Sequence, residues 1–236
     1  MESIITLENI VKYFKKQIVI DNLSLSIKKG EIYGLLGANG AGKSTTINIL
    51  LGFIKPNSGK SVINGIDVFK SSKETQKLIG YIPENVNLYP YLSGIENLNY
   101  FCKLNGKNYD QKKLEHILVK CGLDLHEHKV KTKNYSKGMK QKVGIAIAYA
   151  KQAIVYLLDE PASGLDPLAS NDLSKLLKNL SSNGATIFMA SHDIFRVRET
   201  CDRIGILKNG LLLKEMYSND VTTKELEQIY IKYMKD

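Results

Sequence analysis

A glycine-rich loop between an apolar strand and a helix constrains this chain more than any other feature. Residues 37–44 read G-A-N-G-A-G-K-S, which fits the pattern G-x-x-x-x-G-K-[S/T]. Residues 31–36 before the loop are short and apolar, as a strand is, and residues 43–51 are predicted to be a helix that Gly52 can end. This order of strand, loop and helix predicts a phosphate-binding loop in an α/β core of the P-loop type.

Each residue type in the loop has a chemical reason. Gly37, Gly40 and Gly42 let the backbone bend and approach phosphate oxygens, while the N–H groups at the helix start favour anions. Lys43 is expected to reach the β- and γ-phosphates, and the hydroxyl of Ser44 is expected to bind Mg²⁺. The predicted nucleotide contacts of this segment are Gly37, Asn39, Gly40, Ala41, Gly42, Lys43, Ser44 and Thr45.

Two carboxylates follow a second apolar run. Residues 153–160 read A-I-V-Y-L-L-D-E, as a buried parallel strand with an acidic end does. Parallel sheets bind ligands at the carboxyl ends of their strands. Asp159 is therefore expected to orient Mg²⁺, and Glu160 to act as the general base toward a water that attacks the γ-phosphorus. Mg²⁺ is implied because Lys43 alone does not neutralise the charge of ATP.

The remaining pattern predicts the domain organisation. Residues 4–10, 18–27 and 62–68 are interpreted as strands of an N-terminal antiparallel β subdomain, and 78–82, 153–158 and 185–190 as strands of a mainly parallel sheet. Helical periodicity indicates an inserted α-helical lobe and an amphipathic C-terminal helix. The predicted parts of this one domain are a core over 1–84 and 141–217, a helical lobe over 85–140 and a C-terminal helix over 218–236.

Composition narrows the classes of function. The formal net charge of +9 suits an anionic ligand, a nucleic acid or a membrane face, but the lysines are scattered along the chain. The 3 cysteines are widely spaced, which argues against a disulfide framework. No apolar stretch approaches the roughly 20 residues that a membrane helix needs. His126 and His128, in a polar stretch, are expected to be exposed.

The order of motifs resembles the nucleotide-binding subunits of ABC transporters over the whole chain. Between the phosphate loop and the acidic strand, residues 135–141 read Y-S-K-G-M-K-Q, similar to the family signature L-S-G-G-Q. After the acidic strand, S-G-L-D at 163–166 looks like the D-loop, and S-H-D at 191–193 carries the switch histidine, His192. A signature before the acidic strand separates this family from other phosphate-loop enzymes.

The resemblance implies further roles. ATP and Mg²⁺ are the expected cofactors, and two subunits, as a homodimer or a pair of different ATPase chains, are expected to sandwich two ATP molecules. Ser136 and Gly138 would contact the γ-phosphate held by the other subunit, Asp166 would link the two sites, and His192 would sense the γ-phosphate. An aromatic residue near the N-terminus stacks on adenine in the family. Phe14 matches that position, with Tyr13 as the adjacent alternative.

The chain departs from the family pattern at several positions. Glu84, in I-G-Y-I-P-E, stands where Gln usually binds Mg²⁺, and its carboxylate is expected to face the ion in that place. The signature has Tyr135, Lys137 and Met139 in place of Leu, Gly and Gln. These features resemble the ABC-2-type branch, which favours export over import. The resemblance implies a separate integral membrane permease as partner, and a location in the cytoplasm, peripheral on the cytoplasmic face of the cell membrane.

Other functions have less support in the sequence. A soluble ABC ATPase that acts on ribosomes or DNA is favoured only by the unclustered positive charge, so no nucleic acid is expected as partner. A phosphate-loop GTPase lacks support because no N-K-x-D motif occurs in the sequence. A module that binds ATP without hydrolysis is disfavoured by Glu160 and His192. Support of metalloenzyme maturation remains an alternative within the branch.

Overall fold

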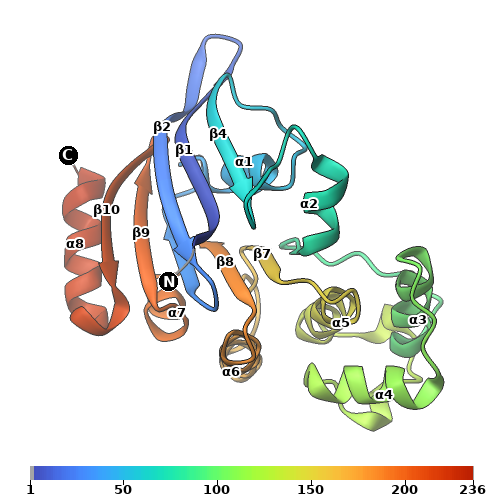
Figure 1. Cartoon of the computed structure of the whole chain (residues 1–236). Coiled ribbons are helices and arrows are strands. Elements are labelled where there is room, and N and C mark those ends of the chain that lie inside the picture. The colour runs from blue at the N-terminus through green and yellow to red at the C-terminus, as the bar shows by residue number, and fades with distance from the viewer. Residues whose placement is uncertain (1–2, 236) are drawn as a thin grey trace.

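The computed structural model of this chain describes residues 3–235 and contains two β-sheets with helices packed around them (Figure 1). The first sheet is antiparallel and has the order β2-β1-β4-β5, while the second has the order β10-β9-β3-β8-β7-β6. The strands of the first sheet are β1 (Ser3–Phe14), β2 (Gln17–Lys28), β4 (Ser58–Ile63) and β5 (Ile66–Asp67). Those of the second are β3 (Ile32–Leu36), β6 (Ile79–Ile82), β7 (Val155–Asp159), β8 (Thr186–Ser191), β9 (Arg203–Lys208) and β10 (Leu211–Tyr217).

The second sheet is parallel except at one edge. Strands β9, β3, β8, β7 and β6 pair in parallel, and β10 pairs antiparallel with β9. Every residue of β3 and β8 is buried, which explains why these segments are short apolar runs without alternation. The predicted fold class, with a mainly parallel core sheet, an antiparallel β subdomain and a helical lobe, is confirmed.

The helices pack in two groups. The α-helices are α1 (Lys43–Leu50), α2 (Ser72–Leu78), α3 (Gly94–Leu104), α4 (Gln111–Lys120), α5 (Lys137–Ala150), α6 (Pro167–Ser182), α7 (Ile194–Thr200) and α8 (Thr223–Lys235). Helix α1 lies between the two sheets, where Ile47 and Leu50 share a core with Ile5 and Phe188. Helices α5, α6 and α7 cover the other face of the parallel sheet, and the lobe helices α3 and α4 join the same core.

Helix α5 belongs to both the lobe and the core, so the predicted boundary between residues 140 and 141 falls inside it. The last turn of the helix packs on β6. A Cβ added to Gly80 in β6 would lie 2.5 Å from the Cβ of Ala148 in α5. Glycine at position 80 therefore allows the end of the helix to approach the sheet closely.

Three local features differ from the sequence interpretation. The expected strand over 62–68 is a hairpin, because Asn64 and Gly65 both adopt positive φ, 51° and 75°, and reverse the chain between β4 and β5. Helix α2 was not expected, since only one of its residues, Thr75, is buried and it has little apolar periodicity. His128 is buried, contrary to the expectation, and its Nε2 lies 3.0 Å from the carbonyl oxygen of Leu123.

The C-terminal helix packs on its own chain. Leu226 is buried, Tyr230 contacts the core, and Nζ of Lys208 in β9 donates to the carbonyl of Tyr233 at 3.0 Å. The last residue of the predicted helix, position 236, lies outside the described residues. Within residues 3–235, no helix is both long and apolar enough to cross a bilayer. The cysteines at positions 102, 121 and 201 are buried free thiols.

Candidate nucleotide site

The residues predicted from the phosphate loop and the acidic strand meet at one edge of the parallel sheet. Strands β3, β8 and β7 are neighbours, so the loop after β3, Glu160 after β7 and His192 after β8 lie side by side at their carboxyl ends. A cavity of about 460 Å³ opens there. Its lining residues are Phe14, Gln17, Val19, Ala38, Asn39, Gly40, Gly42, Lys43, Ser44, Thr45, Glu84, Asp159 and Glu160.

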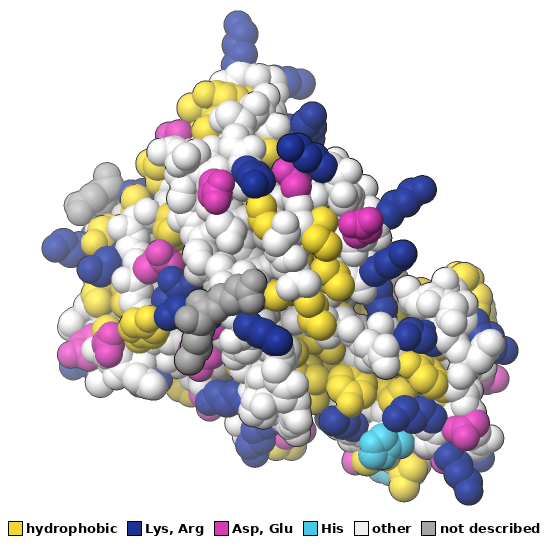
Figure 2. Space-filling view, in the orientation of Figure 1, with side chains coloured by type: hydrophobic (Ala, Val, Ile, Leu, Met, Phe, Trp, Pro, Cys, Tyr) yellow, Lys and Arg dark blue, Asp and Glu magenta, His cyan; other side chains and the backbone are white. Residues whose placement is uncertain are grey.

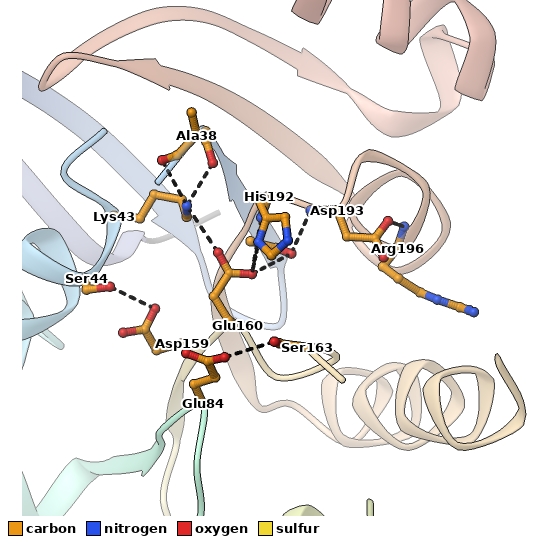
Figure 3. Close-up of polar contacts among 12 residues, drawn as sticks. Ala38, Lys43, Ser44, Glu84, Asp159, Glu160, Ser163, His192, Asp193 and Arg196 are labelled. Atoms are coloured by element: carbon orange, nitrogen blue, oxygen red, sulfur yellow. Dashed lines mark hydrogen bonds and ion pairs between the residues drawn. The ribbon is translucent and has the colours of Figure 1, made fainter. Parts of the chain in front are cut away.

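Lys43 is the buried cation of this cavity. Its ammonium Nζ donates to the carbonyl oxygens of Gly37 at 2.7 Å and Ala38 at 3.2 Å, and it lies 3.1 Å from Oε1 of Glu160 (Figure 3). The two carbonyl oxygens accept hydrogen bonds from the ammonium group, and the carboxylate of Glu160 lies at ion-pair distance from it. The lysine side chain is only 5% exposed, and the loop curls around it as a phosphate loop does around its lysine.

Close backbone contacts explain two of the glycines. Gly42 has φ of 109°, and a Cβ there would lie 2.7 Å from the carbonyl oxygen of Val19. A Cβ on Gly37 would lie 2.6 Å from the carbonyl oxygen of Leu207. These glycines therefore let the loop pack closely against β2 and β9.

Ser44 and Asp159 place two oxygen donors together. The Ser44 hydroxyl Oγ donates to Oδ1 of Asp159 at 3.1 Å. Burial raises the pKa of Asp159 above its ordinary value, although the hydrogen bond from Ser44 opposes that effect. Hydroxyl and carboxylate oxygens suit Mg²⁺, which proteins hold through one or two carboxylates together with substrate phosphates. Among the described residues no group of three or more His, Cys, Asp and Glu side chains is placed to hold a metal ion.

Glu160 connects Lys43 to the end of β8. Its Oε2 accepts from Nδ1 of His192 at 2.9 Å, from the His192 backbone N–H at 3.2 Å and from Oγ of Ser191 at 3.2 Å. Burial would raise the pKa of Glu160, but the hydrogen bond from His192 and the charge of Lys43 outweigh it and hold the pKa below its ordinary value. The carboxylate is therefore charged at neutral pH, and its Oε2 is held by three donors.

The backbone of Glu160 supports this placement. Its φ is 47°, in the left-handed region that non-glycine residues seldom adopt. Such strained residues persist only where their surroundings hold them, and they concentrate at functional sites. Here the bonds from Ser191 and His192, and the backbone N–H of Glu160 to the carbonyl of Ala190 at 2.9 Å, hold the turn.

Phe14 and Glu84 both line the cavity. Phe14 ends β1, is 45% exposed and lies under Nζ of Lys12 at 5.1 Å from the ring centre. The alternative, Tyr13, does not line the cavity. Glu84 follows β6, and its Oε1 accepts from Oγ of Ser163 at 2.9 Å. The cavity wall therefore includes an exposed aromatic ring and a carboxylate.

Several predicted residues lie outside this cavity. Ser136 is exposed and its Oγ accepts from the backbone N–H of Met139, which makes it the N-cap of α5. Asp166 likewise caps α6 through the N–H of Ala169. Gly138 is buried against Ala169, and His192 faces a second hollow of about 250 Å³ shared with Ser163 and Arg196. Gly37 and Ala41 support the loop from behind.

The structure also adds residues that sequence reasoning missed. Gln17 and Val19, from the start of β2, line the cavity beside Phe14, and no motif marks them. Ser191 donates to Oε2 of Glu160, although the S-H-D motif predicts a role only for the histidine. Ser163 lies in the quoted S-G-L-D and binds Glu84, a contact that depends on two loops meeting in space.

Comparison with known proteins agrees with this geometry. A family model described as ABC transporter matches residues 20–163, which is more than half of the chain. The bacitracin transport ATP-binding protein BcrA of Bacillus licheniformis is 39% identical over 217 residues, covering 92% of this chain and 70% of that protein. The linearmycin resistance ATP-binding protein LnrL of Bacillus subtilis is 36% identical over 208 residues, covering 87% and 67%.

Solved structures give the same result. An ATP-binding subunit of an ABC transporter superposes with a TM-score of 0.82 at 28% identity, over 97% of this chain and 100% of the other. The dimeric ATP-binding cassette MJ0796, in a post-hydrolysis state with ADP and phosphate, superposes with a TM-score of 0.80 at 28% identity, over 91% and 98%. With the phosphate loop, the acidic strand and His192 gathered at one sheet edge, this chain belongs to the ABC transporter family as an ATP-binding, ATP-hydrolysing subunit.

Proposed function

We propose that this subunit hydrolyses Mg²⁺-ATP in the 460 Å³ cavity and powers export through a separate membrane permease. The observation that carries the site assignment is the continuous chain of contacts from Lys43 through Glu160 to His192 across three neighbouring strand ends. These contacts connect the ammonium group of Lys43, the carboxylate of Glu160 and the imidazole of His192.

Nucleotide binding is assigned to the loop, α1 and β1. The polyphosphate would lie over the N–H groups of residues 39–45, where Lys43 contributes a buried positive charge. The ring of Phe14 would stack on adenine, a contact worth about 1–3 kcal/mol. Ser44 and Asp159 would hold Mg²⁺, and Glu84 supplies a further oxygen on the cavity wall. The ion supplies charge neutralisation for the β- and γ-phosphates.

Glu160 is proposed as the general base. It is charged at neutral pH because His192 and Lys43 outweigh the effect of burial on its pKa, so it can accept a proton from the attacking water. His192 orients the carboxylate through Nδ1 and remains 53% exposed, so its ring can also contact the γ-phosphate. The reaction then depends on positioning and charge stabilisation, without a covalent intermediate.

A dimer would complete the site. Ser136, Gly138 and Asp166 lie outside the cavity of their own subunit, at the starts of α5 and α6. Their placement supports a role toward ATP held by a second subunit, as a homodimer or with a paired ATPase chain. The dimeric state of the similar cassette MJ0796 supports the same proposal.

Export is favoured by the relatives and by the signature of the chain. Two relatives bear names that refer to bacitracin transport and linearmycin resistance. The subunit would act at the cytoplasmic face of the membrane, with the helical lobe against the permease. Lysine and arginine side chains are dispersed over the face in Figure 2 rather than gathered in a stripe, which gives no support for a nucleic-acid surface.

Equilibrium binding of radiolabelled ATP tests the site. Lys43→Ala should lose most of the affinity, whereas Lys29→Ala, an exposed lysine on the same chain, should not. For the dimer, mixing a Ser136→Arg subunit with a Lys43→Ala subunit should restore at most one composite site. Two fully active sites in that mixture would refute a site shared between subunits.

Inside-out membrane vesicles test the direction of transport. The subunit, co-expressed with the permease that co-purifies with it, should drive ATP-dependent uptake of bacitracin into such vesicles, because uptake there corresponds to export from cells. Vesicles with the Lys43→Ala subunit are the control. Uptake only into right-side-out vesicles would contradict export, and co-sedimentation with ribosomes instead of membranes would favour the soluble alternative.

A further inference from the structure

The side chain of Glu84 is held by two segments that lie far from it in sequence. Its Oε1 accepts from Oγ of Ser163, in the loop after β7, at 2.9 Å, and lies 3.9 Å from Nζ of Lys137 at the start of α5. Figure 3 shows Glu84 and Ser163 directed toward each other below Glu160. The loop between β6 and α3, the loop after β7 and the first turn of α5 therefore meet at one carboxylate.

One face of α5 grips the loop that carries Glu84. Residues 137, 141 and 144 follow the i, i+4, i+7 spacing that puts side chains on one helix face. Nε2 of Gln141 donates to the backbone carbonyl of Glu84 at 3.0 Å. A Cβ on Gly144 would lie 3.1 Å from Cγ2 of Val86. Gln141 thus holds the backbone of the loop, and Lys137, on the same face of α5, faces the carboxylate of Glu84.

Lys137 also touches the loop after β7. A Cβ added to Gly164 would lie 3.6 Å from Nζ and 3.7 Å from Cδ of Lys137, so the lysine side chain runs along the Ser163–Gly164 segment. Its side chain is 29% exposed, against 48% for Glu84, so the lysine is the more enclosed partner of this pair. A shift of the loop after β7 or of the loop that carries Glu84 would therefore change the contacts of Lys137.

The two residues also compensate each other chemically. Glu84 lines the nucleotide cavity, where a carboxylate repels the charge of a polyphosphate. The family pattern has a neutral Gln at that position and a neutral Gly at the position of Lys137. This chain therefore carries one extra negative charge and one extra positive charge, and the fold brings them within 3.9 Å.

We propose that Lys137 is a positioning residue that neutralises Glu84 and holds it against Ser163, so that the cavity accepts ATP despite the carboxylate. This inference rests on the proposed nucleotide site. Without the lysine, the carboxylate repels ATP and loses its link to α5. With a neutral residue at position 84, the lysine has no such task.

A double-mutant cycle on ATP binding tests the proposal in the purified full chain, with Mg²⁺ and with EDTA. Lys137→Gln should raise the Kd for ATP about two- to fivefold at low salt, as for a partly exposed ion pair. The effect should shrink at 1 M salt, because screening weakens interactions between partly exposed charges. In the Glu84→Gln background Lys137→Gln should have no effect, and Lys137→Arg should bind ATP like the unmodified chain.

Controls separate this idea from the nucleotide site itself. Lys140→Gln, one turn along the same helix, should leave the Kd unchanged. A normal Kd for Lys137→Gln, or an equal rise in the Glu84→Gln background, would overturn the pairing. If Lys43→Ala also binds ATP normally in this assay, the proposed site has failed; if Lys43→Ala loses binding, only the pairing has failed. Equal melting temperatures of the variants exclude misfolding as the cause.

Discussion

Replacing Glu160 by Gln should lower turnover and, at the same time, tighten ATP binding. Gln keeps the shape of the side chain, and its amide oxygen can still accept the bonds that Oε2 receives from Ser191 and His192. Its NH₂ group would then face Nζ of Lys43, where Oε1 now lies at 3.1 Å. The base and the ion pair to Lys43 are lost together, but the rest of the contact network stays.

The magnitudes follow from the geometry. Loss of a general base lowers kcat by about 100-fold or more. Nζ of Lys43 lies 3.1 Å from Oε1 of Glu160, so a phosphate oxygen that approaches the ammonium group competes with this carboxylate. A hydrogen bond to a charged group contributes about 1.5–3 kcal/mol. If Glu160→Gln removes about 1.5 kcal/mol of interaction between residue 160 and Lys43, the lower end of this range, the Kd for ATP should fall about tenfold. About 1.4 kcal/mol corresponds to a factor of ten.

The assay pairs steady-state phosphate release with equilibrium ATP binding at constant Mg²⁺. Glu227→Gln, an exposed carboxylate on α8, is the matched control for loss of one negative charge. We also expect the Glu160→Gln subunit to accumulate as a dimer with ATP in size-exclusion chromatography. Turnover at the unmodified rate would remove Glu160 as the base. A weaker Kd would refute the competition between Glu160 and phosphate for Lys43.

Three further changes test the site and its scaffold. Gly42→Ala should abolish ATP binding and destabilise the fold by about 1–3 kcal/mol, measured by urea unfolding, because φ of 109° strains a residue with a Cβ that also meets Val19. Asp159→Asn should impair Mg²⁺-dependent ATP binding yet stabilise the free protein at pH 7. Burial raises the pKa of Asp159, so its charge penalty is full above that pKa, and the gain should vanish as the pH falls below the ordinary value of 3.8. Arg203→Met should destabilise the fold by about 3 kcal/mol, because it leaves Glu31, 2.7 Å from Nε and 9% exposed, without its cation; addition of Glu31→Gln should recover part of the loss, and no recovery would contradict the pairing.

Local signals carried most of the fold assignment. The buried runs before the phosphate loop and before Asp159 are strands because their continuous apolar character suits a sheet covered on both faces. The turn at Asn64-Gly65 is difficult to predict because it lies inside an apolar stretch. Helix α2 is difficult to predict because only one of its residues is buried, so its sequence has no clear apolar periodicity. His128 is a similar case: its neighbours in the sequence are polar, which predicts exposure, but the side chain is buried.

The sequence by itself determined the parts of the site that are contiguous in the chain. The loop at 37–44 needs its glycines and lysine at fixed spacing, and the pair Asp159-Glu160 follows directly from its strand, so both are legible as patterns. Only the tertiary structure decided which residues meet. The parallel order β3-β8-β7 brings Lys43, Glu160 and His192 into contact, because neighbouring strands that run the same way end at the same edge.

The contacts of Glu84 illustrate the difference most clearly. Its departure from the family pattern was visible in the sequence, but its partners were not. Ser163 lies 79 positions after Glu84 in the chain. Lys137 lies on helix α5, whose distance from the sheet depends on the close approach of Ala148 to Gly80. Such pairings depend on the packing of whole elements, which no local pattern encodes, whereas the chemistry of a loop is written in consecutive residues.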